Sequence, residues 1–366
     1  MGLVERVDAA IDAALVNRIV GCVILINKDG ETVYSRAAGF ADRESGTPMA
    51  RNSIFRLASV TKPIVATTVL RLIDLGLIGL NDRVTRYLPW FTPANPDGSL
   101  ADIRIRHLLS HTSGLAYDRM PTDASSGTAG IVNSLKQTLT NIAREPLAFA
   151  PGTGWDYGTS LDVLGAVLAA INGSDVEDAI AAYVTEPLGM TDTHFYVTDP
   201  SRLTSAYADG KPPVRMGEPH VMHDDQGNVV GTFSPGRILN PAAAQNGGSA
   251  MAGTADDVMK LLEVYNSQPG LLAPATVATA LANQIGDLPR RPHDAGKRFG
   301  FLGAVLDDPK AAGNPGPRGT VDWGGVWGHN WVVDPLNRLT IVTCTNTTFE
   351  GCNGPFRDDI LRAVYA

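Results

Sequence analysis

The chain opens with apolar residues that recur every three or four positions, from Leu3 to Ala14. This spacing predicts an amphipathic helix over residues 3–17. Residues 22–26 are then all apolar, and residues 27–30 end in an Asp-Gly pair that suits a tight turn before a second β-rich run. The opening therefore predicts a helix followed by a β-hairpin.

Helical and extended patterns alternate along the rest of the chain. Residues 80–195 are mostly helical with many breaks, and residues 197–248 are irregular and rich in Pro and Gly. Thr254, with an acidic residue three positions on, is an N-cap signal that predicts a helix start. Further helices are expected over residues 59–76, 160–171, 176–184 and 356–365, and further strands over residues 299–305, 320–323, 331–334 and 339–345.

The order of these elements predicts the architecture. Strands occur near both ends of the chain and helices lie between them, which indicates an antiparallel sheet built from both termini with a helical insertion. We expect an α+β fold in which residues 1–75 and 250–366 form a domain around this central sheet. Residues 76–249 are expected to form a mostly helical domain, in which the irregular segment 197–248 borders the pocket.

Composition and charge exclude several classes of protein. The 366 residues carry 30 Lys and Arg against 38 Asp and Glu, for a net charge of −8, which argues against nucleic-acid binding. The most apolar candidate for a membrane span, residues 63–80, is interrupted by Arg71 and Asp74, so we expect no membrane partner. The charged N-terminus does not have a signal-peptide pattern. A soluble cytoplasmic protein is the default expectation, and its oligomeric state is left open.

Neither a metal ion nor a cofactor is expected. The three cysteines, Cys22, Cys344 and Cys352, contain no C-x-x-C pair, and the seven histidines are scattered. Free thiols are expected, although Cys344 and Cys352 could pair in an oxidising compartment. The sequence also lacks the G-x-S-x-G, H-E-x-x-H and phosphate-loop motifs.

One short motif can carry chemistry: Ser59-Val60-Thr61-Lys62, an S-x-x-K. Pro63 follows directly, and because proline is tolerated only in the first turn of a helix, the helix should begin close to Ser59. The Ser59 hydroxyl would then lie at the positive end of the helix dipole, with Lys62 one turn on along the same face. This arrangement suits an acyl-transfer nucleophile, but the segment alone is equally compatible with an N-cap serine beside a surface lysine.

A tyrosine in a glycine-rich turn is the second candidate. Tyr157 lies within residues 151–160, just before a predicted helix. A phenol titrates near 10, and a neighbouring ammonium would lower that value and make Tyr157 a proton relay for Ser59. Taken without Ser59 and Lys62, this tyrosine would be read as packing beneath the turn.

Residues 322–331 form the third candidate, because three of the five tryptophans fall there among glycines. Glycine in a strand permits another backbone or a ligand to approach closely. An edge strand here could present a backbone N–H to an oxyanion, or the segment could be an aromatic hairpin in the core. His329 lies in the same run, but a single histidine beside tryptophan is more often structural.

Taken in this order, the three candidates resemble the serine β-lactamase and penicillin-binding protein superfamily, in its class C-like branch, and most of all the family VIII carboxylesterases. The likeness covers nearly the whole chain. Three further segments resemble structural signatures of that group: residues 108–115 (Leu-Leu-Ser-His-Thr-Ser-Gly-Leu), 186–190 (Glu-Pro-Leu-Gly-Met) and 253–257 (Gly-Thr-Ala-Asp-Asp).

The resemblance implies a fold and a set of roles. The fold is β-lactamase/DD-peptidase-like, a central antiparallel sheet flanked by helices beside a mostly helical domain, with the site between them. Ser59 would be the acylated nucleophile, and Lys62 and Tyr157 would share the role of proton acceptor. The backbone N–H groups of Ser59 and Val326 would form the oxyanion hole.

Two departures from the family pattern bear on the substrate. The second motif is commonly Tyr-x-Asn, but here Thr159 takes the place of the asparagine that would bind an amide. The third motif of lactamases and peptidases begins with Lys or His, whereas here the segment is Trp323, Gly324 and Gly325. With that cation absent, we expect Trp323, Gly324, Gly325 and Thr159 to contact a neutral ester with an apolar part, in place of a penicillin or a peptide.

The expected function is therefore that of a serine hydrolase which cleaves small carboxylic esters through an acyl-enzyme on Ser59. The same machinery could serve an acyltransferase, an amidase or a weak β-lactamase, because the choice of acceptor depends on pocket shape. A penicillin-binding-like sensor module, which would stay acylated, is the alternative outside enzymes.

Overall fold

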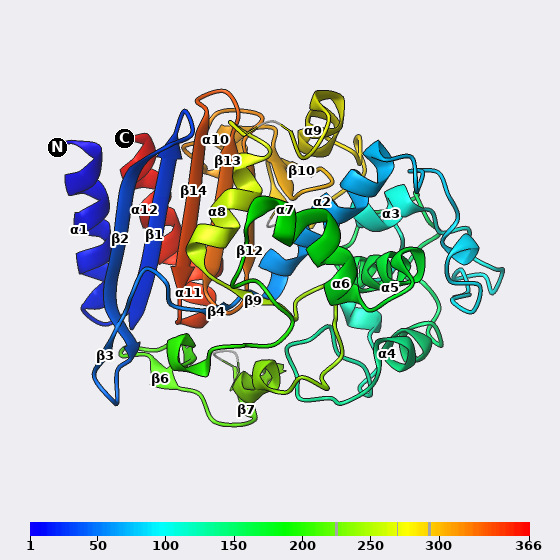
Figure 1. Ribbon diagram of the computed structural model, residues 1–366, viewed down its shortest axis with the longest axis horizontal. Helices are drawn as coiled ribbons and strands as arrows, with labels where there is room; N and C mark the ends of the chain where they lie inside the picture. Colours follow the sequence, from blue (N-terminus) through cyan, green and yellow to red (C-terminus); the bar gives the residue numbers. More distant parts are fainter. Residues whose placement is uncertain (224–225, 269, 292–293) are drawn as a thin grey trace.

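In the computed structural model, which describes residues 1–223, 226–268, 270–291 and 294–366, a large sheet lies beside a mostly helical region. Helices α1 (Leu3–Leu15) and α12 (Pro355–Tyr365) pack together on one side of the sheet, where both termini also lie (Figure 1). Helix α8 (Ala255–Glu263) crosses the opposite face, and α2 (Thr61–Asp74) leads from the sheet into the helical region. The predicted α+β fold is confirmed.

Among the described residues, eight strands form the main sheet in the order β10-β11-β12-β13-β14-β1-β2-β3, and every neighbouring pair is antiparallel. Strands from the two ends of the chain meet at the pair β1 and β14, as the sequence predicts. The strands are β1 (Gly21–Lys28), β2 (Glu31–Asp42), β3 (Thr47–Pro48), β10 (Lys297–Phe299), β11 (Ala304–Leu306), β12 (Val321–Gly325), β13 (His329–Asp334) and β14 (Leu339–Thr345).

The apolar run of β1 is continuous because helices cover both faces of the sheet. Ile24 and Ile26 pack with α1 and α12, whereas Val23 and Leu25 point to the opposite face and join the larger core with α2 and α8. Successive side chains of a strand point to opposite faces of the sheet. A strand that is buried on both faces therefore has apolar residues at consecutive positions, with no alternating polar ones.

The helical region lies between β4 (Phe55–Arg56) and β9 (Ala252–Gly253) in the sequence. At its centre α5 (Ser160–Asn172) packs against α2 and against the shorter helices α3 (Ile105–Leu109) and α6 (Val176–Ile180). The region also contains α4 (Leu135–Ile142), α7 (Glu186–Leu188), the 3₁₀ turns η1 (Ala58–Val60), η2 (Val84–Arg86), η3 (Tyr117–Arg119), η5 (Pro200–Arg202) and η6 (Pro235–Leu239), and the π-helical turn η4 (Ala181–Thr185). Three short helices follow β9 in the sequence: α9 (Pro274–Leu281), α10 (Pro309–Ala312) and α11 (Thr348–Cys352).

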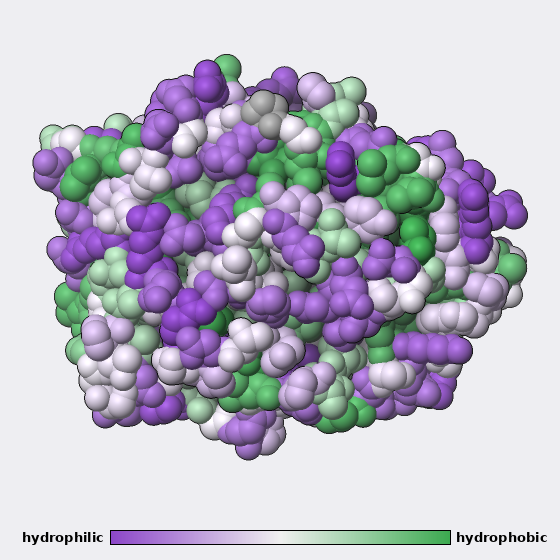
Figure 2. Space-filling view, viewed as in Figure 1, coloured by the Kyte–Doolittle hydropathy of each residue, from purple (hydrophilic) through white to green (hydrophobic). Residues whose placement is uncertain are grey.

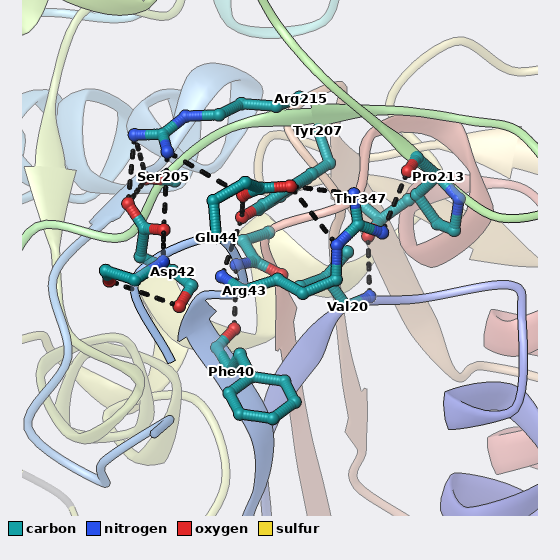
Figure 3. A network of polar contacts seen from close by, with 12 residues as sticks. Val20, Phe40, Asp42, Arg43, Glu44, Ser205, Tyr207, Pro213, Arg215 and Thr347 are labelled. Carbon is teal, nitrogen blue, oxygen red and sulfur yellow. Dashed lines mark hydrogen bonds and ion pairs between the residues drawn. The ribbon is translucent and has the colours of Figure 1, made fainter. Parts of the chain in front are cut away.

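Segment 197–248 contains short strands that the sequence does not reveal. Tyr207, Ser205 and Arg215 of this segment bind the end of β2 through Asp42, Arg43 and Glu44 (Figure 3), with Arg215 2.9 Å from Asp42. The short strands of this segment are β5 (Tyr207–Ala208), β6 (Val214–Arg215), β7 (His220–His223) and β8 (Val229–Phe233), whereas β4 (Phe55–Arg56) pairs with β9 (Ala252–Gly253) outside it. These polar contacts anchor one end of the segment to the sheet.

The single strand predicted over residues 299–305 is wrong, because the chain turns back on itself there. β10 ends at Phe299 and β11 begins at Ala304, and the Gly300 N–H donates to the Gly303 carbonyl at 2.8 Å. A Cβ at Gly300 would lie 2.6 Å from the Ala280 carbonyl oxygen, so the turn needs glycine for close packing. The apolar pattern of the two strands hides this two-glycine turn.

The outer surface mixes residue types. Figure 2 shows hydrophilic residues interspersed with smaller hydrophobic patches over the face that it presents. No helix within the described residues has the length and apolar character needed to cross a membrane.

Candidate active site

Ser59 lies in a tight turn at the start of a buried helix. The 3₁₀ turn η1 leads directly into α2, so the hydroxyl is at the helix N-terminus, as the position of Pro63 predicts. Ala58, just before it, has a φ of +45°, a conformation that costs about 1–2 kcal/mol for a residue with a side chain. Such strain persists only where surrounding packing enforces it, and it is common at reacting groups.

Lys62 points back to Ser59 and uses all three of its N–H donors. Its Nζ lies 3.2 Å from the Ser59 Oγ, 3.2 Å from the Tyr117 Oη and 2.7 Å from the Gly248 carbonyl oxygen. The side chain is 4% exposed, so it is not the surface lysine of the alternative interpretation. The structure therefore brings the predicted hydroxyl and amine together within the fold.

Tyr157 also contacts the Lys62 amine. The Lys62 Nζ lies 4.6 Å from the centre of its ring, and the Trp323 indole N–H donates to its Oη at 2.9 Å. Desolvation raises the pKa of the Tyr157 phenol well above 10, while hydrogen bonds with Ser59 and Trp323 act in the opposite direction. At neutral pH Tyr157 is therefore a neutral phenol, and it lines the same cavity as Ser59.

His111 explains how the turn around Tyr157 is held. Its carbonyl accepts from Asp156 N at 3.2 Å, and its Nδ1 accepts from Gly158 N at 3.3 Å. Burial, reinforced by the Lys62 charge, lowers the pKa of His111 well below its usual value, so the ring is a neutral acceptor. A Cβ at Gly158 would lie 1.8 Å from the Leu115 carbonyl oxygen, which makes glycine necessary in the Tyr-Gly-Thr segment.

The sequence analysis missed Tyr117, a second tyrosine at the site. Its Oη contacts Lys62, and its ring centre lies 5.6 Å from that of Tyr157. Desolvation raises the pKa of the Tyr117 phenol, although the Lys62 charge acts against this. The only signal in the sequence is its place two residues after the Leu-Leu-Ser-His-Thr-Ser-Gly-Leu segment, and this does not indicate contact with Lys62.

The Trp-Gly-Gly segment supports the site from the edge of β12. Gly325 packs so closely that a Cβ would lie 2.4 Å from the Leu57 carbonyl oxygen, and a Cβ at Gly324 would lie 2.8 Å from the Cys352 sulfur. The glycines thus admit neighbouring chain segments, as the sequence suggests, but the close neighbours belong to the protein. Trp323 contacts Tyr157. None of these three residues is among the described residues that line the large cavity, where we expected them to bind substrate.

The structure does not support a substrate contact for Thr159. Its side chain is 1% exposed, and its Oγ1 is buried with no hydrogen-bond partner among the described residues. The threonine precedes α5 and turns into the protein, whereas Tyr157, two residues earlier, faces the cavity. The motif spacing of the family predicts an outward side chain here, but the local turn buries it.

A cavity of about 1000 Å³ opens in front of Ser59. Tyr157, Tyr117 and Val326 line it together with residues within the loop 120–131 and with residues 218–219 and 230–234. Glu218 is the one charged side chain among the described lining residues, and most of the others are small or apolar. The cavity therefore suits a large uncharged group and offers no cation to a carboxylate.

Other residues considered for chemistry have structural roles. The Nε2 of His329 lies 2.7 Å from the Arg56 carbonyl oxygen, and burial lowers the pKa of His329 to about 4, as fits the structural role favoured by the sequence. Cys22, Cys344 and Cys352 are free thiols. No cluster of His, Cys, Asp and Glu suited to a metal ion occurs in the described part of the chain.

A serine at a helix start, with a buried lysine and a tyrosine beside it next to an antiparallel sheet, is the arrangement expected of a serine acyl-transfer enzyme. Comparison with known families agrees with this class. The family model described as Beta-lactamase matches residues 7–365, and the chain belongs to this family.

Two relatives and one solved structure are similar to most or all of this chain. Esterase EstB from Burkholderia gladioli is 44% identical over all of this chain and 95% of its own length, which confirms the predicted likeness to family VIII carboxylesterases. Acyltransferase calJ from Penicillium decumbens is 30% identical over 70% of this chain and 63% of its own. The solved structure of EstCE1, a hydrolase with promiscuous acyltransferase activity, superposes with a TM-score of 0.92 at 39% identity, covering 100% of this chain and 98% of the other.

Proposed function

We propose that this protein is a carboxylesterase that hydrolyses small, uncharged esters through an acyl-enzyme on Ser59. One observation carries the proposal: the Ser59 hydroxyl, the Lys62 amine and the Tyr157 phenol meet at the wall of one large cavity. The 44% identity to Esterase EstB over the full chain supports the same activity.

The reaction proceeds by two acyl transfers. The Ser59 oxygen attacks the ester carbonyl while its proton passes to the Lys62/Tyr157 pair, and a tetrahedral oxyanion forms. The backbone N–H groups of Ser59 and Val326 stabilise that oxyanion, each by about 3 kcal/mol. The C–O bond of the ester then breaks, and the alcohol leaves with the proton from the pair. Water next attacks the acyl-enzyme by the same route, which releases the carboxylic acid and restores Ser59.

The Lys62 amine lies against the Tyr157 ring, so the proton taken from Ser59 is assigned to the two side chains together and not to either one alone. Tyr157 is a neutral phenol at neutral pH, and all three donors of Lys62 are used. One proton must therefore leave the pair before it can act as a base. We expect kcat/KM to rise between about pH 7 and pH 10, and a flat profile over that range would contradict the assignment.

The cavity supports an uncharged substrate with a sizeable apolar part. Its walls hold Glu218 but no described Lys or Arg, and burying a substrate carboxylate there would leave it without a partner. Trp323 stands where related lactamases and peptidases carry a cation. Penicillins and D-Ala-D-Ala peptides, which carry carboxylates, are therefore poor substrates in this proposal.

A direct test compares the wild-type protein and Ser59→Ala on p-nitrophenyl esters of increasing acyl length, with nitrocefin alongside. We expect ester hydrolysis by the wild type, little or no nitrocefin turnover, and loss of ester hydrolysis in the variant with an unchanged circular dichroism spectrum. Full activity in Ser59→Ala would end the proposal, and nitrocefin turnover comparable with that of the esters would overturn the substrate class.

Acyl transfer to an alcohol is the second candidate. The largely apolar cavity favours it, because a bound alcohol could exclude water from the acyl-enzyme, and both calJ and EstCE1 are described as having acyltransferase activity. Adding an alcohol during ester turnover and measuring the new ester by chromatography separates the two activities. A cytoplasmic location stays a prediction.

A further inference from the structure

A buried carboxylate lies behind the proposed site, and the mechanism above does not use it. Asp162, in the first turn of α5, is 0% exposed. Its Oδ2 accepts from the Ser126 hydroxyl at 2.7 Å, and its Oδ1 accepts from the Gly248 N–H at 3.2 Å. Because an ionised carboxylate without exposure is costly, it needs either a cation nearby or a proton of its own.

Both hydrogen-bond partners of Asp162 lead to Lys62. Gly248, whose N–H binds Asp162, accepts from the Lys62 Nζ through its carbonyl at 2.7 Å. Ser126, whose hydroxyl donates to Asp162, lies 3.5 Å from the Tyr117 Oη, and Tyr117 in turn contacts Lys62. The carboxylate thus lies behind two of the three acceptors that surround the lysine ammonium.

Gly248 packs directly against both Asp162 and Ser126. A Cβ at that position would lie 2.5 Å from the Asp162 Oδ2 and 2.3 Å from the Ser126 Oγ. The carboxylate therefore packs directly against the backbone that binds Lys62, with no room for a side chain between them.

Two cations on different elements act on Asp162. Lys62 on α2 and Arg237 on η6 interact electrostatically with it, and the two phenols, Tyr117 and Tyr157, are neutral. Arg237 is held by the Ala244 carbonyl and the Asn246 side chain at 2.9 and 3.0 Å.

On the Lys62 side, the remaining titratable neighbour is His111, which is also neutral. Burial raises the pKa of Asp162, whereas the Lys62 charge and the hydrogen bonds from Ser126 and Gly248 act against that rise and favour the ionised carboxylate.

We propose that Asp162 is a positioning residue that holds Lys62 as an ammonium ion in the resting enzyme, through its negative charge and through the hydrogen bonds of Ser126 and Gly248. It does not touch substrate. Its charge raises the pH at which the Lys62/Tyr157 pair gives up a proton, and it therefore sets the lower pH limit of ester hydrolysis. The proposal rests on the proposed function only where it is tested by measuring ester hydrolysis.

The main experiment measures kcat/KM against pH for the wild type, Asp162→Asn and a control, Asp257→Asn. Asp162→Asn removes a negative charge near Lys62 and Tyr157. Their proton should then be lost more easily, so the acidic limb of the kcat/KM profile should move to lower pH by about one unit or more. Asp257 is a buried carboxylate of similar surroundings, bound by Asp192 N, Thr193 and Lys260. Its variant should leave the limb in place.

Two outcomes of the main experiment would overturn the proposal. If the acidic limb of Asp162→Asn coincides with that of the wild type, Asp162 is protonated in the enzyme and serves only to pack against its neighbours. Equal shifts in both variants would mean that the effect is not specific. Ser126→Ala, which removes one of the hydrogen bonds that favour the ionised carboxylate, should move the limb in the same direction as Asp162→Asn but by a smaller amount, and a shift to higher pH would contradict the proposal.

A stability measurement needs no activity and still applies if Asp162→Asn does not fold. In Lys62→Met, Asp162 loses the nearby positive charge, so the pKa of Asp162 in the folded protein rises above its value in the unfolded chain. The variant is therefore least destabilised at low pH, where Asp162 is protonated, and it loses stability as the pH rises towards the folded-state pKa of Asp162. The urea-unfolding difference between wild type and Lys62→Met should therefore be larger at pH 8 than at pH 5. A difference independent of pH would contradict the charge interaction between Asp162 and Lys62 even if ester hydrolysis is observed, whereas absence of hydrolysis alone would count only against the proposed function.

Discussion

At the scale of single residues, the chemistry depends on polar groups whose hydrogen bonds converge. Lys62 is surrounded by three acceptors and two aromatic rings, and Trp323 donates to Tyr157. Ser59 and Lys62 could be predicted from the sequence because they lie one helical turn apart. Tyr117 and Asp162 could not, since only tertiary folding brings them to the lysine.

Tyr157→Phe tests the phenol by removing a single oxygen. The ring and its packing against Lys62 remain, so the fold should be kept while proton transfer is lost. We expect kcat on p-nitrophenyl butyrate to fall by about 10²-fold or more, in the range typical of general acid–base groups. Steady-state kinetics measures this, and a loss below fivefold would leave Lys62 as the only base.

Trp323→Phe tests the indole N–H that binds the Tyr157 oxygen. Removing a donor destabilises the phenolate form, so the pKa of the relay should rise and the acidic limb of kcat/KM should move to higher pH. We expect kcat at pH 7 to fall about tenfold with a smaller change in KM. A pH profile unchanged from that of the wild type would show that Trp323 only packs there.

At the scale of elements, the site is held by close approaches between segments distant in the sequence. β12 approaches the turn η1 at Gly325, and the segment after α3 approaches the Tyr157 turn at Gly158. The sequence predicts most of the helices and strands from their periodicity. It does not predict the β10–β11 turn or the inward direction of Thr159, because both depend on the close packing of neighbouring backbone.

Gly325→Ala tests the approach of β12 to the nucleophile turn. The added methyl would meet the Leu57 carbonyl oxygen at 2.4 Å, so we expect a loss of about 1–3 kcal/mol in the free energy of unfolding and reduced activity. Urea denaturation measures the stability.

Gly165→Ala is the matched control for this substitution. It lies inside α5, where the nearest atoms would be at 3.5 Å, and it should be neutral or stabilising by up to about 1 kcal/mol. Equal stability of the two variants would contradict the packing argument.

At the scale of the whole molecule, the cavity is completed by residues far from Ser59 in the sequence. Residues within 120–131, together with residues 218–219 and 230–234, line it. Their sequences have no periodicity from which a pocket shape could be derived. The class of reaction could thus be predicted from short motifs, whereas the size of the cavity required the folded chain.

Ala129→Phe tests whether this cavity sets the substrate size. Ala129 lines the cavity, and a phenyl ring there would occupy part of its volume of about 1000 Å³. Relative to p-nitrophenyl acetate, we expect kcat/KM for a bulky ester such as p-nitrophenyl cyclohexanecarboxylate to fall about tenfold or more. A uniform loss on both esters would indicate disturbed folding and would count against a size-selective cavity.

The account as a whole depends on covalent chemistry at one hydroxyl. Intact-mass and peptide mass spectrometry during turnover of a slowly hydrolysed ester, such as a p-nitrophenyl ester with a branched acyl group, tests it most directly. We predict a mass increase equal to the acyl group, located on the peptide that contains Ser59 and absent from Ser59→Ala. Ester turnover in which the adduct forms on another residue, or persists in Ser59→Ala, would contradict it.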